Sequence, residues 1–215
     1  LMAFLEGYPQ RYLRVVDQPR IYEHVRLSRN LQPAQVRSAL VETDAAWEFS
    51  AIAIDQPGLF ASVCGVLSYF GMNILRVQAM TNDHGIVLDI FQFEDQEGYL
   101  RLHQTAKSQM TKLLGDVVSG RTDIENRLQG RQRAKETQRQ LKRVTPLIRF
   151  NNHYSRRFTV LEVVAENEWG LLYHISRTIS SQTCDIELVL ISTEGAQAMR
   201  GCPDRCSCAA TWKGQ

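Results

Sequence analysis

The sequence predicts an α+β protein that contains two copies of one strand-helix-strand-strand unit. A strand-like run ends at a Pro-Gly turn and leads into one face of a helix, and this pattern returns 112 residues later. The length of 215 residues suffices for two small domains. A content of 44% hydrophobic and 22% charged residues is typical of a globular chain and excludes a disordered or collagen-like one.

The first 45 residues are predicted to form short helices that pack on the rest of the chain. Pro9, Pro19 and Pro33 separate amphipathic pieces in this segment. No basic region followed by an apolar core is visible at its start, so no secretory signal is expected.

The first unit is predicted over residues 46–155 from local patterning. Apolar residues at helical spacing follow the Pro-Gly turn, Gly71 ends that helix, two strand-like runs flank a turn, and a second amphipathic helix follows. In chain order these elements are a strand at 49–54, a helix at 59–70, strands at 75–79 and 86–91, and a helix within 98–114.

Residues 56–75 form a run of twenty residues without a charge, which raises the question of a membrane span. Glycines, a proline and an asparagine interrupt the run, and this suits a buried helix that leads into a buried strand. We therefore expect no membrane contact. Cys64 and Cys184 lie in apolar surroundings, as free thiols do in a reducing compartment, and a cytoplasmic location is expected.

A basic helix is predicted at 121–143, between the two units. Eight Lys/Arg face three Asp/Glu there, a local charge of +5, whereas the whole chain carries only +2. Aromatic residues that would stack on single-stranded nucleic acid are missing from this segment, so nucleic acid is not an expected partner. A solvated helix is the favoured interpretation, and a docking surface for acidic partners is the alternative.

The second unit is predicted over residues 156–198, where positions of the first unit recur with similar residues. The loop glycine is kept, but the aspartate and proline of the loop are replaced by Asn167 and Trp169. The matched pairs are Asp55 with Asn167, Gly58 with Gly170, Leu59 with Leu171, and Asn73 with Asp185.

The tail at 199–215 matches nothing in the first copy. The second unit is therefore predicted to lack its third and fourth strands and its second helix, which would leave a sheet edge open. A frameshifted or truncated end is our hypothesis for this tail. A zinc site is the rival, although a Cys-x3-Cys-x-Cys spacing without a nearby histidine lacks the usual paired arrangement.

The strand-to-helix loop of the first unit is the candidate site. Asp55 is expected to accept hydrogen bonds from the first amides of the helix as its N-cap, and Gly58 permits close approach of a ligand. A free amino acid could place its carboxylate on the helix amides and its ammonium on Asp55. The alternative is a well-capped helix start without a ligand. In the second loop Asn167 supplies no negative charge, which puts binding there in doubt.

These motifs resemble an ACT domain, a small amino-acid-sensing module of ferredoxin-like βαββαβ type. The resemblance rests on the loop 55–60 and on Gly71-Met72-Asn73-Ile74 at the next junction. More narrowly, the chain is similar to the carboxyl-terminal part of the bifunctional PII uridylyltransferase/uridylyl-removing enzymes. The segments that carry this similarity are 9–13, 21–24, 88–92, 158–163 and 170–173.

The resemblance implies a regulatory module that senses glutamine and decides whether a parent enzyme adds UMP to the PII signal protein or removes it. Catalytic residues and Mg²⁺ are expected only in other domains of such an enzyme, because this chain has no Asp-x-Asp and no His-Asp pair. We expect no cofactor in this chain. Because ACT units pair side by side, a homodimer is one possible assembly. A ligand-free interaction module is the alternative. The residues implied for ligand binding are Asp55, Gln56, Pro57, Gly58, Leu59, Asn73, Asn167, Gly170 and Leu171.

Overall fold

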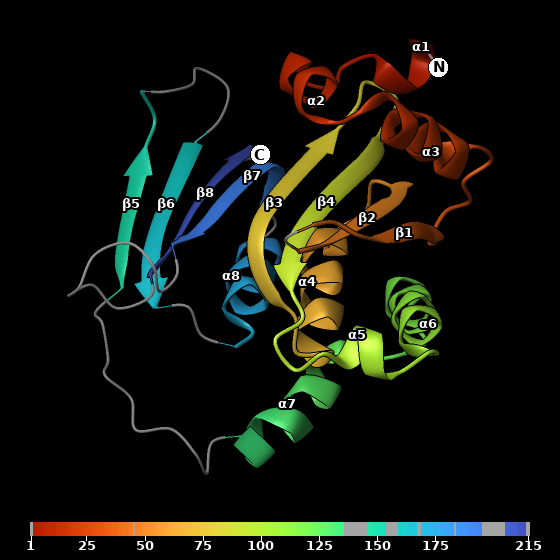
Figure 1. Cartoon of the computed structure of the whole chain (residues 1–215). Coiled ribbons are helices and arrows are strands. Elements are labelled where there is room, and N and C mark those ends of the chain that lie inside the picture. The colour runs from red at the N-terminus through yellow and green to blue at the C-terminus, as the bar shows by residue number, and fades with distance from the viewer. Residues whose placement is uncertain are drawn as a thin grey trace.

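The computed structural model of the chain is built around one antiparallel sheet, whose strands lie in the order β1-β2-β4-β3-β7-β8-β6-β5 (Figure 1). The structure describes residues 2–44, 46–135, 146–153, 159–166, 169–182, 184–194 and 205–213. Helices cover the sheet, so the α+β class with an antiparallel sheet is confirmed.

The first half of the sheet follows the predicted patterning. The strand β2 (Trp47–Ile54) leads into α4 (Leu59–Tyr69), and β3 (Asn73–Thr81) and β4 (Ile86–Glu94) follow as an antiparallel pair. The amphipathic stretch after Gly98 forms two helices, α5 (Tyr99–Leu102) and α6 (Ala106–Val118). The basic segment begins as a separate helix, α7 (Ile124–Lys135), and residues 136–145 lie outside the described part.

The basic helix α7 packs against the first half of the molecule. Its Ile124 and Leu128 are buried in the main core. Arg127 and Arg131 lie over the ring of Tyr69, with 5.8 and 5.0 Å from guanidinium carbon to ring centre. Two of the basic side chains of α7 therefore interact with an aromatic ring of α4.

The N-terminal segment contains α1 (Met2–Leu5), α2 (Gln10–Val15) and α3 (Gln18–Ser28), as predicted, but then adds β1 (Val36–Glu42). We expected helices throughout residues 1–45, and this was wrong for β1, which pairs antiparallel with β2. All but the last of its residues are half-buried, so the strand lacks the clear alternation of buried and exposed positions that would reveal it in the sequence.

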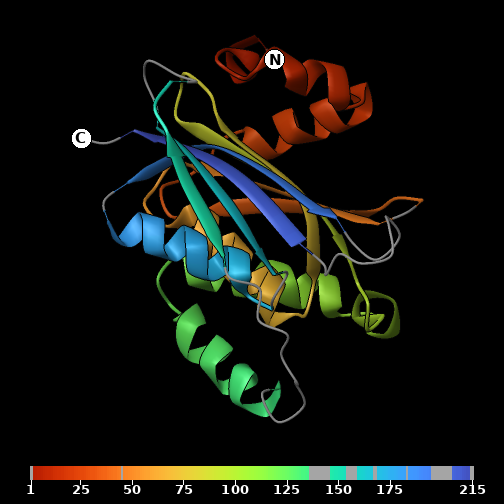
Figure 2. The same ribbon diagram turned by 90° about the vertical axis from the view of Figure 1, so that its left-hand side faces the viewer.

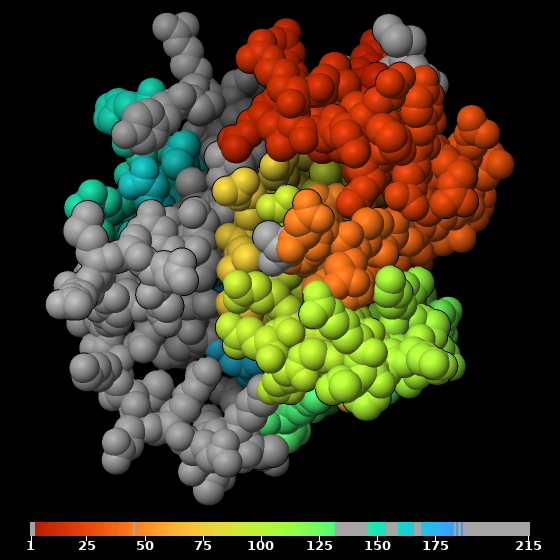
Figure 3. Space-filling view, viewed as in Figure 1, coloured from red at the N-terminus to blue at the C-terminus, as the bar shows by residue number. Residues whose placement is uncertain are grey.

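The two faces of the first half-sheet bury different partners because neighbouring residues of a strand point to opposite sides. Ile52, Leu88 and Ile90 face the N-terminal helices, whereas Phe49 and Phe91 face α4. Figure 2 shows α1 to α3 on one side of the sheet and α4, α6, α7 and α8 (Leu171–Ser181) on the other. In Figure 3 the N-terminal segment, in red, gathers at the top of the molecule.

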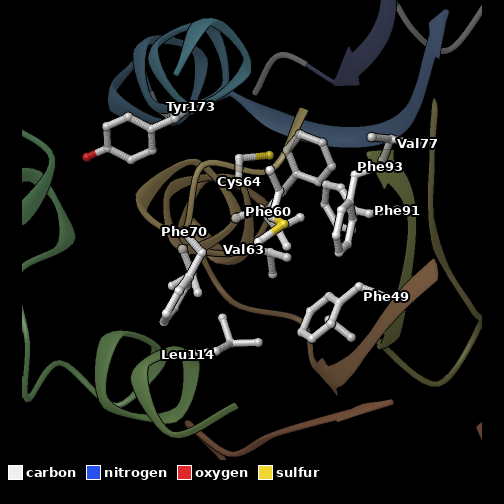
Figure 4. Packing of buried hydrophobic residues seen from close by; sticks show 14 of the residues in the cluster. Phe49, Phe60, Val63, Cys64, Phe70, Val77, Phe91, Phe93, Leu114 and Tyr173 are labelled. Carbon is white, nitrogen blue, oxygen red and sulfur yellow. The ribbon is translucent and has the colours of Figure 1, made fainter. Parts of the chain in front are cut away.

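The helix α4 lies at the centre of the main core. Figure 4 shows Phe60 and Cys64 of α4 among the side chains that face β4, where Phe91 stacks on Phe60 at 5.7 Å between ring centres. A Cβ on Gly65 would lie 2.9 Å from Ile124 of α7 and 3.0 Å from Tyr173 of α8. The absent side chain at Gly65 therefore lets both helices approach α4 closely.

The second half of the sheet joins the first through β3 and β7 (Asp185–Glu194), which pair antiparallel from Arg76 opposite Ser192 to Ala79 opposite Val189. The strand β8 (Arg205–Lys213) pairs with β7 and with β6 (Thr159–Glu166). We expected the second unit to lack this third strand, and that expectation was wrong. Pairing on both sides of β8 covers the edges of β6 and β7.

The fourth strand position of the second half belongs to β5 (Leu147–Asn151), which pairs with β6. Residues 147–150 were assigned to the first unit, but they lie next to the second. The strand precedes β6 in the chain, just as β1 precedes β2, so each half takes its outer strand from the segment before it. The cysteine-rich tail falls partly on β8, and residues 195–204 lie outside the described part.

A buried polar chain fixes the N-terminal helices to β2. The hydroxyl of Tyr12 and Nδ1 of His24 are 2.9 Å apart, and Nε2 of His24 is 3.0 Å from Oγ of Ser50. Burial lowers the pKa of His24 to about 4 because a charged imidazole would lose its hydration, and the nearby Arg20 lowers it further. The imidazole is therefore neutral near neutral pH.

Candidate functional site

A cavity of about 330 Å³ lies where the two halves of the molecule meet. It is bounded by the loop before α4, the adjoining ends of β3 and β4, the last turn of α8 and the start of β7. Five of the predicted site residues line it together. They are Asp55, Gln56, Pro57, Gly58 and Leu59, and the second half contributes Ser180, Cys184 and Ile186.

Backbone hydrogen bonds give the loop its shape. The N–H of Asp55 donates to the carbonyl oxygen of Gly85 at 2.9 Å, and the N–H of Leu59 donates to the carbonyl oxygen of Gln56 at 3.2 Å. Gly58 takes φ +75°, a conformation that favours glycine, and an added Cβ there would meet no atom within 4 Å. The loop glycine therefore makes the turn and leaves space in front of the helix.

The N-cap of α4 is Gly58, without a side-chain hydrogen bond to the helix. We expected Asp55 in this role, and the structure contradicts it, because the turn at 56–59 inserts three residues between Asp55 and the helix. The first i to i−4 bond of the helix runs from the N–H of Ser62 to Gly58, at 2.9 Å. Of the preceding amides, that of Leu59 donates to Gln56, whereas those of Phe60 and Ala61 have no acceptor within the helix.

Asp89 is the residue of this cavity that the sequence analysis missed. It lies in β4 with 1% of its surface exposed, and its Oδ2 has no hydrogen-bond partner. Its register neighbours are Ala51 on β2 and Ala79 on β3, whose small side chains leave room beside the carboxyl group. A charge inside the apolar run 86–91 was the signal that could have identified it.

The pKa of Asp89 is raised to about 8, first because burial removes the hydration of the charged form and then because the carboxylate of Asp55 is near. Burial also raises the pKa of the Cys64 thiol, and the neighbouring Asp89 raises it further, against a hydrogen bond with Ser176. Near neutral pH both groups are therefore protonated. Cys64 and Cys184 are free thiols, as predicted.

The remaining predicted site residues lie elsewhere. Asn73 is at the opposite end of β3, where its Nδ2 donates to Oε2 of Glu94 at 3.2 Å. Gly170 is the N-cap of α8, with φ +78°, and Leu171 packs against the main core. Asn167 falls outside the described residues.

The arrangement in the two halves is related by the sequence repeat. The antiparallel pairing of β3 with β7 brings the start of each central helix, α4 or α8, towards the end of the other. At the first loop this leaves the cavity. At the second loop Trp169, the counterpart of Pro57, is half-buried and its Nε1 donates to the carbonyl oxygen of Ser68 at 2.8 Å. Ser68 is the counterpart of Ser180, which lines the cavity.

Metal binding finds no support in the described residues, because no three of their His, Cys, Asp and Glu side chains form a cluster suited to an ion. Within the same part of the chain, no helix combines the length and the apolar character needed to cross a bilayer.

Known proteins with similar sequences point to one group of enzymes. No family model matches the chain. The bifunctional uridylyltransferase/uridylyl-removing enzymes of Gluconobacter oxydans and Rhodospirillum rubrum are each 28% identical to it, over 200 and 201 residues. The enzyme of the same name from Azospirillum brasilense is 27% identical over 198 residues.

The chain is a homologue of one segment of these enzymes. The matches cover 90 to 91% of this chain but only 21% of each relative. The chain thus spans about a fifth of the length of the bifunctional uridylyltransferase/uridylyl-removing enzymes that it matches. The predicted similarity to these enzymes is confirmed.

Proposed function

We propose that this chain is the amino-acid-sensing module of a uridylyltransferase/uridylyl-removing enzyme, with glutamine as its ligand. The module consists of two ACT-type units that share one sheet, and the ligand occupies the cavity between them. Catalysis belongs to other parts of the parent enzyme, which acts on the PII signal protein. The observation that carries this proposal is the polar cavity at the predicted loop, on a chain homologous to these enzymes.

The size of the cavity suits a single amino acid. At about 330 Å³ it falls at the lower end of the range for small-molecule sites, about 300–1,000 Å³. Its lining combines apolar side chains such as Leu59 and Ile186 with polar ones such as Gln56. This combination favours a short, partly polar ligand over a nucleotide.

The charges of the cavity match those of an amino acid. The first-turn amides at the start of α4 and the positive end of that helix attract the α-carboxylate. Asp55, at the exposed rim, and Asp89, in the interior, provide negative charge for the ammonium group. A ligand with both charges is thus complementary to the helix amides and to the two carboxyl groups.

One ligand is proposed for each chain. The indole of Trp169 is half-buried against Ser68, at the position that corresponds to the cavity in the other half. The loop there also offers Asn167 in place of Asp55, so the negative charge for an ammonium group is missing. Gly170 and Leu171 then serve the start of α8 rather than a second ligand.

The site is adjacent to the contact that holds the N-terminal segment, which provides a route for regulation. The turn after β3 accepts the loop N–H of Asp55 at Gly85. The same turn binds the N-terminal segment, since Nδ2 of Asn82 donates to the carbonyl oxygen of Phe4 at 3.0 Å. The hydroxyl of Tyr8 donates to the backbone carbonyl oxygen of Ile86 at 2.9 Å. Ligand binding at the loop is proposed to act on the neighbouring parts of the enzyme through this turn.

Isothermal titration of the purified chain with L-glutamine tests this proposal. We expect saturable binding with one ligand per chain. Asp55→Ala should weaken binding more than Asn167→Ala, which serves as the matched control in the second loop. A folded chain that gives no heat at millimolar glutamine would refute the proposed function.

A further inference from the structure

We propose that Asp89 binds the ammonium group of the ligand and releases its own proton to solvent as the ligand enters. This inference rests on the proposed function, and it assigns the recognition of the ammonium group to a buried side chain of β4. It makes a primary ammonium group a requirement for the ligand and makes binding dependent on pH.

The position of Asp89 is the first argument. A carboxyl group with 1% exposure and an Oδ2 without a hydrogen-bond partner is costly in a folded protein, because buried polar atoms are nearly always bonded. Ala51 and Ala79 flank it in the sheet, and a larger side chain at either position would fill the space beside the carboxyl group. Asp89 is one of the residues that line the cavity.

The second argument is the charge of the surroundings. The described lining of the cavity contains no Lys, Arg or His that would neutralise an ionised Asp89. The titratable groups that interact with it electrostatically are Asp55 from the loop, Cys64 from α4 and Tyr8 from the N-terminal segment. Cys184, which precedes β7, lines the same cavity. None of these supplies a positive charge. A cation that stabilises an ionised Asp89 would therefore have to come with the ligand.

Binding then transfers a proton in a balanced way. In the empty cavity burial raises the pKa of Asp89 to about 8, so the group is protonated near neutral pH. A ligand ammonium beside it favours the carboxylate, the O–H bond of Asp89 breaks, and the proton goes to the buffer. The product is a carboxylate–ammonium pair inside the cavity, and one proton is released for each ligand bound.

The test is titration of the folded chain with L-glutamine near neutral pH in two buffers of different ionisation enthalpy. The difference in heat gives the number of protons released, and we expect about one for the wild-type chain. Asp89→Asn should release none and should bind glutamine about tenfold more weakly or worse. Asp44→Asn, which alters an exposed aspartate in the loop after β1, is the matched control and should behave as wild type.

A second ligand gives an independent readout of the ammonium group. Glutaramic acid is glutamine with hydrogen in place of the α-ammonium, and it should bind the wild-type chain at least about tenfold more weakly than glutamine does. This preference should disappear in Asp89→Asn, because the partner of the ammonium is then neutral.

Three outcomes distinguish the proposals. Glutamine binding that releases no proton and is unchanged in Asp89→Asn overturns the role of Asp89 but leaves the proposed function intact. An equal preference for glutamine over glutaramic acid in both chains does the same. Absence of glutamine binding to the folded wild-type chain overturns both the proposed function and this inference.

Discussion

Replacing Asp89 by Asn should stabilise the ligand-free chain, and the gain should grow with pH. Burial holds the pKa of Asp89 at about 8, above its ordinary value of 3.8. The native state therefore keeps a proton that the unfolded state loses between these two values, and stability falls as pH rises through that window. Asn has nearly the same shape and no proton to lose, so the variant escapes this loss.

The magnitude follows from the same pKa. One pKa unit corresponds to about 1.4 kcal/mol, which places the cost of the acid at roughly 4 kcal/mol near pH 7. Since relaxation around the carboxyl group reduces this cost, we expect a gain of roughly 2–4 kcal/mol for Asp89→Asn near pH 7.5. The gain should fall below about 1 kcal/mol near pH 4, where the acid is protonated in both states.

Urea unfolding followed by circular dichroism at the two pH values measures this difference. Asp44→Asn, at an exposed carboxyl group, should show no such pH-dependent gain. If Asp89→Asn stabilises the chain equally at both pH values, or not at all near pH 7.5, then Asp89 is not a buried protonated acid and the reasoning fails.

Three further predictions concern the packing of α4, the protonation of His24 and the second loop. Gly65→Ala should lower the free energy of unfolding in urea by roughly 1–3 kcal/mol, because its Cβ would press on Ile124. The control Gly115→Ala, in open space on α6, should be neutral or slightly stabilising. Equal effects of the two substitutions would contradict the close packing at Gly65. The free energy of unfolding should fall as pH drops from about 6.5 to about 4, because His24 is protonated in the unfolded chain before it is protonated in the native state. His24→Gln should lack this loss when unfolding is measured over the same pH range. Trp169→Phe should lower the free energy of unfolding by about 1 kcal/mol, because the hydrogen bond of the indole to Ser68 is lost. Calorimetry should still give one glutamine per chain. Two glutamines per chain would show that the indole alone closes the second site.

The repeat and the loop were predictable from sequence because their patterns are local. Apolar residues at helical spacing from Leu59 identified α4, and the Pro-Gly turn located the residues that line the cavity. The role of Asp55 as N-cap was mistaken, since the left-handed turn at Gly58 replaces a side-chain cap and sequence shows only the residue types. Glycine can adopt a positive φ, but the presence of a glycine in the sequence does not show that it does so.

The parts that sequence reasoning missed depend on contacts between distant segments. Asp89 lines a cavity only because the loop, α4 and the second half of the chain surround it, and they do so only after β3 pairs with β7. The strand β8 was missed because its residues match nothing in the first copy, whereas its backbone can pair with β6 and β7 whatever its side chains are. Asn73 was included because it lies at a conspicuous junction, but that junction is at the other end of β3.

A crystal structure of the chain grown with L-glutamine tests the central claim most directly. The account predicts one glutamine per chain in the cavity between α4, β4 and α8, with its carboxylate at the start of α4 and its ammonium within hydrogen-bond distance of Asp89. An empty cavity at saturating glutamine, or glutamine bound at the Trp169 loop instead, would contradict it.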